Sequence, residues 1–350
     1  QKNMALQEIN PHLEELDVDV LYHLGLTSED DLPGLFGDTK FVCMGGSGER
    51  AEKFATKISQ QLGLPIERYC KEPSEGQEEK EDKVESTSDI LTAVDKVIGG
   101  ELNLRETMRK INNFVATEAG LPTPIGKTER FELYKVGSII VVSHGMGEPS
   151  MQIELDEVTK VLHYAGAEDF EYFRIGTSGG VGVPAGGVVI ADEAMNDSLE
   201  PIHKKTEIGK EKEYQTQLNT QLAQDLLAAA GDINAQIGKT MGTDDFYLGQ
   251  GRMDGFFDPG YTLEEHFEFL DKAHEAGVRN IEMEATAFAA FCLRAGIPAT
   301  IICCALLDRL EGDQVTSTPE ELASFSDNAE QVVINYIRSR LIEDSITPAH

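Results

Sequence analysis

Apolar residues follow two patterns along this chain, and each pattern predicts one kind of element. Nearly continuous Val- and Ile-rich runs are typical of strands that are buried on both faces of a sheet. Such runs are TKFVCMGG, VGSIIVVSHGMG, FEYFRIGTSGG, GGVVIADEA, NIEMEATAF and ATIICCALL. Other segments carry apolar residues three and four positions apart and end near glycine, as helices do. These are ERAEKFATKISQQLG, MQIELDEVTKVLHYAGA and TQLNTQLAQDLLAAAGD. The alternation predicts an α/β fold of three layers, α/β/α, with helices on both faces of a central sheet.

One segment interrupts this alternation. Residues 71–90 are highly charged and contain no aromatic residue, which predicts a solvated loop. Two short amphipathic candidates follow, LTAVDKVI and a stretch from about 104 to 118. The apolar residues that share one face of the second candidate are Leu104, Met108, Ile111 and Val115. We interpret residues 71–125 as an acidic and amphipathic insertion within a single domain that spans residues 1–350.

Composition narrows the classes of partner. The chain has 62 Asp and Glu residues against 30 Lys and Arg residues, and its formal net charge is −32. This charge disfavours binding to a nucleic acid or to an anionic membrane surface. The first residues lack the pattern of a secretory signal, and no run of about 18 apolar residues occurs, so we expect a cytoplasmic protein. The cysteines lie in or beside apolar runs without the paired spacing of a zinc site, so we expect reduced thiols and no bound metal.

Several predicted strands pass directly into glycine-rich turns. These turns are MGGSGER (44–50), SHGMGEP (143–149) and RIGTSGGVG (174–182). Ligands of open α/β sheets bind beyond the carboxyl ends of the strands, where glycines let backbone N–H groups approach an anion. MGGSGER lacks the third glycine of a dinucleotide-binding fingerprint, which disfavours a Rossmann cofactor site.

RIGTSGG adds a fixed cation, Arg174, and a hydroxyl, Thr177, to these backbone donors. That combination suits a small oxyanion such as orthophosphate. The alternative is a structural turn between strands in which Arg174 belongs to an ion pair.

Two other motifs combine polar groups with apolar or glycine-rich sequence. In NIEMEATAF, Glu282 and Glu284 lie on one side of an extended stretch, where a sugar diol could donate to a carboxylate. The alternative is an acidic helix start. In GQGRMDG (249–255), Gln250 and Arg252 would leave the same face of an extended segment. The alternative here is a polar surface turn.

Taken together and in order, these motifs resemble the nucleoside phosphorylase I family, and in particular its uridine phosphorylases of the animal type. The segments that carry the resemblance are FGDTKFVCMGGSGER, SHGMGEPSMQIELDE, FRIGTSGGVG, DDFYLGQGRMDG, GVRNIEMEATAFAA and LLDRLEGDQ. The resemblance implies a nucleoside phosphorylase-like α/β/α fold around a mixed sheet. It also implies reversible phosphorolysis of uridine to uracil and ribose 1-phosphate, with phosphate as co-substrate and no cofactor.

The resemblance also assigns roles by motif position. Residues with an implied role in phosphate binding are Gly46, Arg50, Arg130, Arg174 and Thr177. Residues with an implied role in nucleoside binding are His23, Phe246, Gln250, Arg252, Met283, Glu284 and Arg309. In relatives each active site borrows groups from the neighbouring subunit, so the resemblance implies a homodimer with shared active sites. His23 would therefore reach the ribose 5′-hydroxyl, and Arg130 the phosphate, of the neighbouring subunit.

The implied base readers, Gln250 and Arg252, have hydrogen-bonding groups that match the edge of uracil. Uracil presents a donor at N3–H between acceptors at O2 and O4, and an amide such as that of Gln250 can pair with a neighbouring donor and acceptor. Arg252 would donate to the other carbonyl. Cytosine would leave a buried polar group unpaired, at a cost of about 1 to 3 kcal/mol. The catalytic residues implied are Arg252 and Gln250, which would stabilise the uracil anion, and Glu284 beside the sugar.

Two alternatives remain beside this function. One is another nucleoside phosphorylase, or a nucleosidase, on the same fold. Purine-specific relatives place an acid near the base, whereas this chain offers Gln250 and Arg252. The other is a non-catalytic storage or binding protein that kept the fold, which fold alone does not exclude.

Overall fold

The computed structural model describes residues 5–67, 84, 86–99, 102, 107–108, 110–111, 114–115, 123–126 and 130–346. Within them, the strands of the main sheet are β3 (Phe41–Gly45), β4 (Leu133–Val136), β5 (Ile139–Ser143), β6 (Glu171–Gly180), β7 (Val188–Met195), β10 (Ala235–Gly242), β11 (Val278–Glu282) and β12 (Ala299–Asp308). Two antiparallel pairs lie outside that sheet: β1 (Val20–Leu21) with β2 (Leu26–Thr27), and β8 (Ile202–Glu207) with β9 (Lys210–Gln215).

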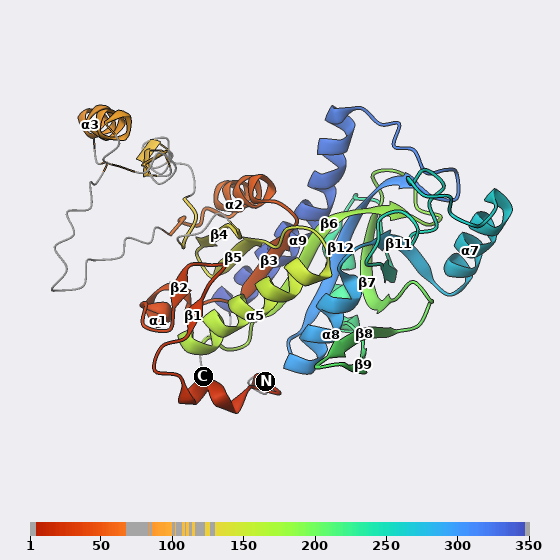
Figure 1. The fold of residues 1–350 in the computed structure, drawn as a ribbon, viewed down its shortest axis with the longest axis horizontal. Coiled ribbons are helices and arrows are strands. Elements are labelled where there is room, and N and C mark those ends of the chain that lie inside the picture. Colours follow the sequence, from red (N-terminus) through yellow and green to blue (C-terminus); the bar gives the residue numbers. More distant parts are fainter. Residues whose placement is uncertain are drawn as a thin grey trace.

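The helices lie mostly between these strands. A short 3-10 helix, η1, spans Pro11–Glu15. The α-helices are α1 (Leu32–Phe36), α2 (Gly48–Leu62), α3 (Thr87–Ile98), α5 (Glu148–Ala165), α6 (Thr220–Ala229), α7 (Leu263–Glu275), α8 (Ala285–Ala295) and α9 (Pro319–Ile346). Figure 1 shows the sheet running through the body of the molecule, with α3 set apart from it.

The main sheet is mixed, with strand order β11-β10-β7-β12-β6-β3-β5-β4. Strand β3 pairs in parallel with β5 and β6, whereas β12 pairs in parallel with β6 and antiparallel with β7. Consecutive side chains of β3 point into different cores. Val42 and Met44 pack with α1, α5 and α8, while Phe41 and Cys43 pack with α2 and α9. The expected α/β/α fold with a central mixed sheet is therefore confirmed.

Strand β6 corrects one sequence-based expectation. RIGTSGG was expected to begin a turn, but residues 174–180 continue the strand. The strand continues because β12 pairs along most of its length, and its last residues, Gly179 and Gly180, pair antiparallel with β11. This extra pairing brings β6 beside the carboxyl end of β11. The prediction that RIGTSGGVG is a turn was wrong.

The predicted helix ends agree with the structure better than the predicted starts. Helices α2 and α5 are followed by Gly63 and Gly166 in left-handed conformation, as expected. Helix α6 begins only at Thr220, because the side chain of Asn219 caps it. LTAVDKVI lies in α3. Most of the proposed 71–125 insertion, including Leu104, lies outside the described residues.

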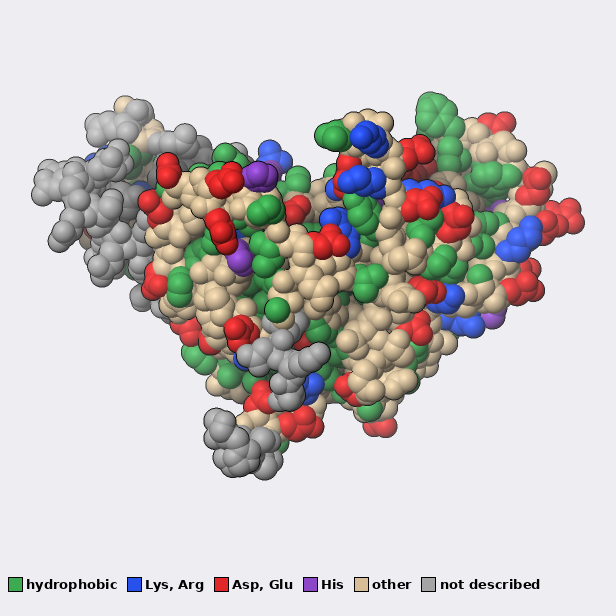
Figure 2. All heavy atoms as spheres, turned by 90° about the horizontal axis from the view of Figure 1, so that it is seen from below, with side chains coloured by type: hydrophobic (Ala, Val, Ile, Leu, Met, Phe, Trp, Pro, Cys, Tyr) green, Lys and Arg blue, Asp and Glu red, His purple; other side chains and the backbone are tan. Residues whose placement is uncertain are grey.

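The surface agrees with the acidic composition. Figure 2 shows Asp and Glu side chains scattered over one face of the molecule. Among the helices that the structure describes, none has both the length and the apolar character needed to cross a membrane. In the same part of the chain, His, Cys, Asp and Glu form no group of three or more that could hold a metal ion.

Candidate active site

One end of the candidate site lies where β3 passes into α2. The strand ends at Gly45, and the Ser47 side chain caps α2 by accepting the Arg50 backbone N–H at 3.4 Å. A small pocket here is lined by Arg50 and by Gly176 and Thr177 of β6, among others. The structure thus brings together two of the predicted phosphate-binding residues at the positive end of a helix dipole. Gly46, a third, lies in the connection between β3 and α2.

Arg174 lies next along β6 and is 4% exposed. Its guanidinium contacts the carboxylates of both Glu282, at 2.7 Å, and Glu284. Nη1 donates to Cys303 Sγ at 3.2 Å, and Nε has no hydrogen-bond partner among the described residues. Arg174 is therefore in an ion pair, as the structural alternative for RIGTSGG expected. Its partners, however, are the glutamates of NIEMEATAF, which belong to the candidate site.

The two glutamates of NIEMEATAF hydrogen-bond to different backbone groups. Glu282, at the end of β11, accepts the backbone N–H groups of Glu284 and Ala285 and so caps α8. Glu284 holds a different backbone group, since its Oε1 accepts the Gly147 N–H at 2.6 Å. Burial alone would raise the pKa of Glu284, but Arg174 lowers it below the ordinary value, so the carboxylate stays ionised. Met283, between them, is half-buried.

Sequence analysis missed His144, which follows β5 in the SHGMGEP turn. Its ring is 1% exposed, and neither ring nitrogen has a hydrogen-bond partner within the described ranges. Burial, and then the nearby Arg174, lowers the pKa of His144 to about 3. The imidazole is therefore neutral near pH 7 and adds no charge beside Arg174 and Glu284. Its place at the carboxyl end of a predicted strand was the sequence feature that could have indicated it.

The GQGRMDG segment lies in the loop between β10 and α7. Gln250 and Arg252 are 4% and 8% exposed, so the alternative of a polar surface turn does not describe them. The backbone is nevertheless not extended. Gly251 has φ +67°, and its N–H donates to the Leu248 carbonyl at 3.0 Å, which closes a turn. The expectation that both side chains leave one face of an extended segment was therefore wrong.

Arg252 is held by several groups. Its Nε and Nη2 donate to Asp254 at 2.8 and 2.7 Å, and Nη2 also donates to the Asp313 carbonyl at 2.9 Å. The guanidinium carbon lies 4.7 Å from the centre of the Phe246 ring. Phe246 is half-exposed, so part of this side chain remains accessible beside the predicted base readers.

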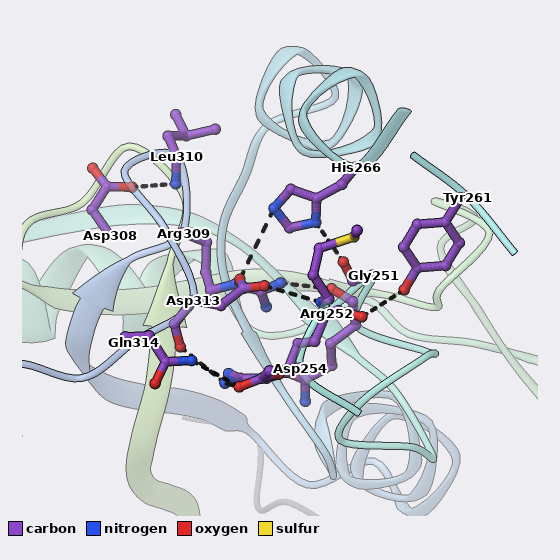
Figure 3. Close-up of polar contacts among 12 residues, drawn as sticks. Gly251, Arg252, Asp254, Tyr261, His266, Asp308, Arg309, Leu310, Asp313 and Gln314 are labelled. Atoms are coloured by element: carbon purple, nitrogen blue, oxygen red, sulfur yellow. Dashed lines mark hydrogen bonds and ion pairs between the residues drawn. The ribbon is translucent and has the colours of Figure 1, made fainter. Parts of the chain in front are cut away.

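Arg309 is almost fully buried in the loop after β12. Its Nη2 donates to the Gln250 carbonyl at 2.9 Å, and its Nε donates to Asp313 at 2.6 Å. Nη1 has no hydrogen-bond partner in the described part of the chain. Figure 3 shows these contacts, which join the loop after β12 to the GQGRMDG segment. The structure therefore brings Arg309 to the predicted base readers.

The two residues expected to act across a subunit contact lie elsewhere. His23, between β1 and β2, contacts Glu157 of α5 through Nδ1 at 2.7 Å, and its backbone N–H donates to the same carboxylate. Arg130, just before β4, is exposed. The structure describes a single chain, so the roles of both residues stay predictions.

Comparisons with known proteins agree with this geometry. The profile of the phosphorylase superfamily matches residues 99–340, and the chain belongs to that family. Within it, the chain is a member of the uridine phosphorylases. It is 35% identical over 342 residues to uridine phosphorylase 1 of Mus musculus, which covers 96% of this chain and 93% of the relative.

Two further matches refine this placement. The solved structure of a Schistosoma mansoni uridine phosphorylase in complex with uracil has a TM-score of 0.76, with 34% identity over 95% of this chain and 98% of that one. A protein named inactive uridine phosphorylase B, from the same organism, is 31% identical over 94% of this chain and 95% of the relative. The group thus includes a protein that is named as inactive.

Proposed function

We infer that this chain catalyses the reversible phosphorolysis of uridine to uracil and ribose 1-phosphate, in pyrimidine salvage. The observation that carries the inference is the buried pair of Gln250 and Arg252 beside the half-exposed ring of Phe246. This pair supplies the amide and the cation that complement the edge of uracil. The relatives named as uridine phosphorylases support the same reaction.

Phosphate binds, in this proposal, at the α2 end of the site. Arg50 and Thr177 line the pocket in which it would bind, the resemblance adds the backbone at Gly46 in the connection between β3 and α2, and Arg174 of β6 supplies the buried cation. Because Arg174 is paired with Glu284, phosphate has to draw part of the guanidinium away from that carboxylate. The ionised Glu284 then accepts from the ribose hydroxyls, next to the Met283 backbone. Phosphate binding and ribose binding are therefore favourably coupled.

The chemical step needs no group beyond these and the two substrates. Phosphate attacks C1′ while the glycosidic bond breaks, so the sugar gains positive charge and uracil gains negative charge. Arg252 and Gln250 stabilise the uracil anion, and the Glu284 carboxylate lies beside the sugar cation. Phosphate is a co-substrate in this scheme, and no cofactor takes part.

The test is product analysis with and without phosphate. Purified protein with uridine and phosphate is expected to give uracil and ribose 1-phosphate, and the phosphate-free sample is expected to give neither. Cytidine and inosine should be poor substrates, because each presents a different edge to Gln250 and Arg252. Uracil release without phosphate would indicate a nucleosidase. Turnover of inosine in place of uridine would indicate a purine enzyme, and no turnover would indicate a non-catalytic protein.

We further propose that the active enzyme is a homodimer in which each site receives His23 and Arg130 from the neighbouring subunit. A heterodimer of Arg130→Ala and Arg252→Ala chains tests this, with two different tags for purification. One of its two sites combines an intact Arg252 with the partner's intact Arg130. We expect about half of the wild-type activity, whereas each parent homodimer should be nearly inactive. If Arg130 acts within its own subunit, the heterodimer will be no more active than its parents.

A further inference from the structure

The carbonyl groups of the base-reading segment, residues 250–252, are each held by a side chain from another part of the chain. The Gln250 carbonyl accepts from Arg309 Nη2 at 2.9 Å. The Gly251 carbonyl contacts His266 Nδ1, and the Arg252 carbonyl accepts from the Tyr261 hydroxyl at 2.9 Å. Figure 3 shows Tyr261 and His266 converging on this segment from the α7 side. Three successive peptide groups are thus fixed by side chains rather than by a strand partner.

The start of α7 fixes where Tyr261 and His266 lie. Thr262 is the N-cap, and its side chain accepts the Glu265 N–H while Glu265 accepts the Thr262 N–H, which forms a capping box. Tyr261 directly precedes this cap, and His266 lies in the first turn, where its N–H donates to the Thr262 carbonyl at 3.0 Å. His266 is 2% exposed. Both side chains are therefore carried by a well-defined helix start.

His266 also faces the loop after β12. Its Nε2 lies 4.0 Å from Asp313 Oδ1, the same oxygen that accepts from Arg309 Nε. The other oxygen of Asp313 accepts the Met253 N–H at 3.2 Å. Because a carbonyl is only an acceptor, the contact with Gly251 requires the proton of His266 on Nδ1. With that proton in place, His266 connects α7 to the base-reading segment and lies beside Asp313.

The turn needs such support for a physical reason. Gly251 has φ +67°. Glycine can adopt several other backbone conformations at similar free energy, so this one is not fixed by the residue itself. Rotation of the peptide groups at Gly251 would swing the side chains of Gln250 and Arg252 in different directions. The carbonyl contacts oppose that rotation, and a carbonyl left unpaired in this buried place costs free energy.

We propose that Tyr261 and His266 are positioning residues that hold Gln250 and Arg252 in the orientation needed to read uracil. Neither side chain has to touch the substrate, since both act through the backbone of the base-reading segment. This proposal rests on the proposed function, because it assigns roles within the same site.

The test compares Tyr261→Phe, His266→Leu and His266→Asn with wild type. The first two variants remove the donor, whereas the asparagine amide can replace Nδ1–H. For each donor-removing variant we expect kcat/KM for uridine to fall by about fivefold to tenfold and the preference for uridine over cytidine to shrink. The KM for phosphate should not change. His266→Asn should recover most of the loss. Tyr214→Phe, which removes a hydroxyl that bonds Glu207 on the β8–β9 pair, is the matched control.

Hydrogen exchange of the peptide that covers residues 248–254 gives a readout that does not depend on turnover. Exchange should be faster in Tyr261→Phe and His266→Leu, and unchanged in Tyr214→Phe. Unchanged exchange, or equal losses for uridine and phosphate, would overturn the proposal. If wild type fails to turn over uridine while the variants still exchange faster, Tyr261 and His266 do hold the base-reading segment and it is the proposed function that is wrong.

Discussion

Replacing Arg252 by alanine is expected to lower kcat/KM for uridine by about 10²-fold to 10³-fold. The guanidinium donates to a uracil carbonyl in our account and stabilises the charge that uracil gains as the glycosidic bond breaks. Its removal frees Asp254, which is partly exposed and can be solvated, but it also takes a donor from the Asp313 carbonyl, so the free energy of unfolding should fall by about 1 kcal/mol. Initial rates at several uridine and phosphate concentrations measure the effect.

Arg338→Ala is the matched control for that variant. Arg338 lies on α9 and contacts Gln61 and Asn335, away from the base readers. It should keep nearly full activity. If Arg252→Ala keeps the wild-type kcat/KM for uridine, Arg252 takes no part in the mechanism.

Replacing Arg174 by alanine should affect both stability and catalysis. The substitution leaves Glu282 and Glu284 buried without their cation, and breaking a buried ion pair in this way costs about 3 to 5 kcal/mol. It also removes the buried cation from the proposed phosphate site. We expect a lower midpoint of thermal unfolding and a strongly raised KM for phosphate.

A second substitution separates these two effects. In Arg174→Ala combined with Glu282→Gln, a neutral amide replaces the buried carboxyl that has lost its cation, so part of the stability should return while the KM for phosphate stays high. Arg174→Lys keeps the charge without the planar fork and should give an intermediate KM. Recovery of phosphate binding together with stability in the double variant would show that Arg174 is structural only.

The layered fold could be predicted because its strands are buried on both faces and therefore read as continuous apolar runs. The same runs marked the strand ends that carry Gly46, His144 and Glu284. The local backbone was harder to predict. RIGTSGG looked like a turn because its pairing partners, β11 and β12, lie more than 90 residues further along the chain, as Asn280 with Gly180 shows.

The base-reading end shows a second limit of sequence analysis. The family resemblance assigned Gln250 and Arg252 of GQGRMDG to the base edge, and an amide and a cation can complement uracil. It did not indicate that Gly251 turns the chain, nor that Tyr261 and His266 hold the resulting carbonyls. Those contacts depend on how α7 packs against the loop. The Thr262–Glu265 capping box marks the start of α7, but it does not indicate what the side chains of that helix start contact.

The most direct test of the central claim is a crystal structure of the protein with uracil and phosphate bound. The account predicts that the Gln250 amide pairs with N3–H and one carbonyl of uracil, and that Arg252 donates to the other carbonyl. It also predicts phosphate between Arg50, Thr177 and Arg174. A base edge that faces other residues, or phosphate bound away from Arg174, would contradict the account.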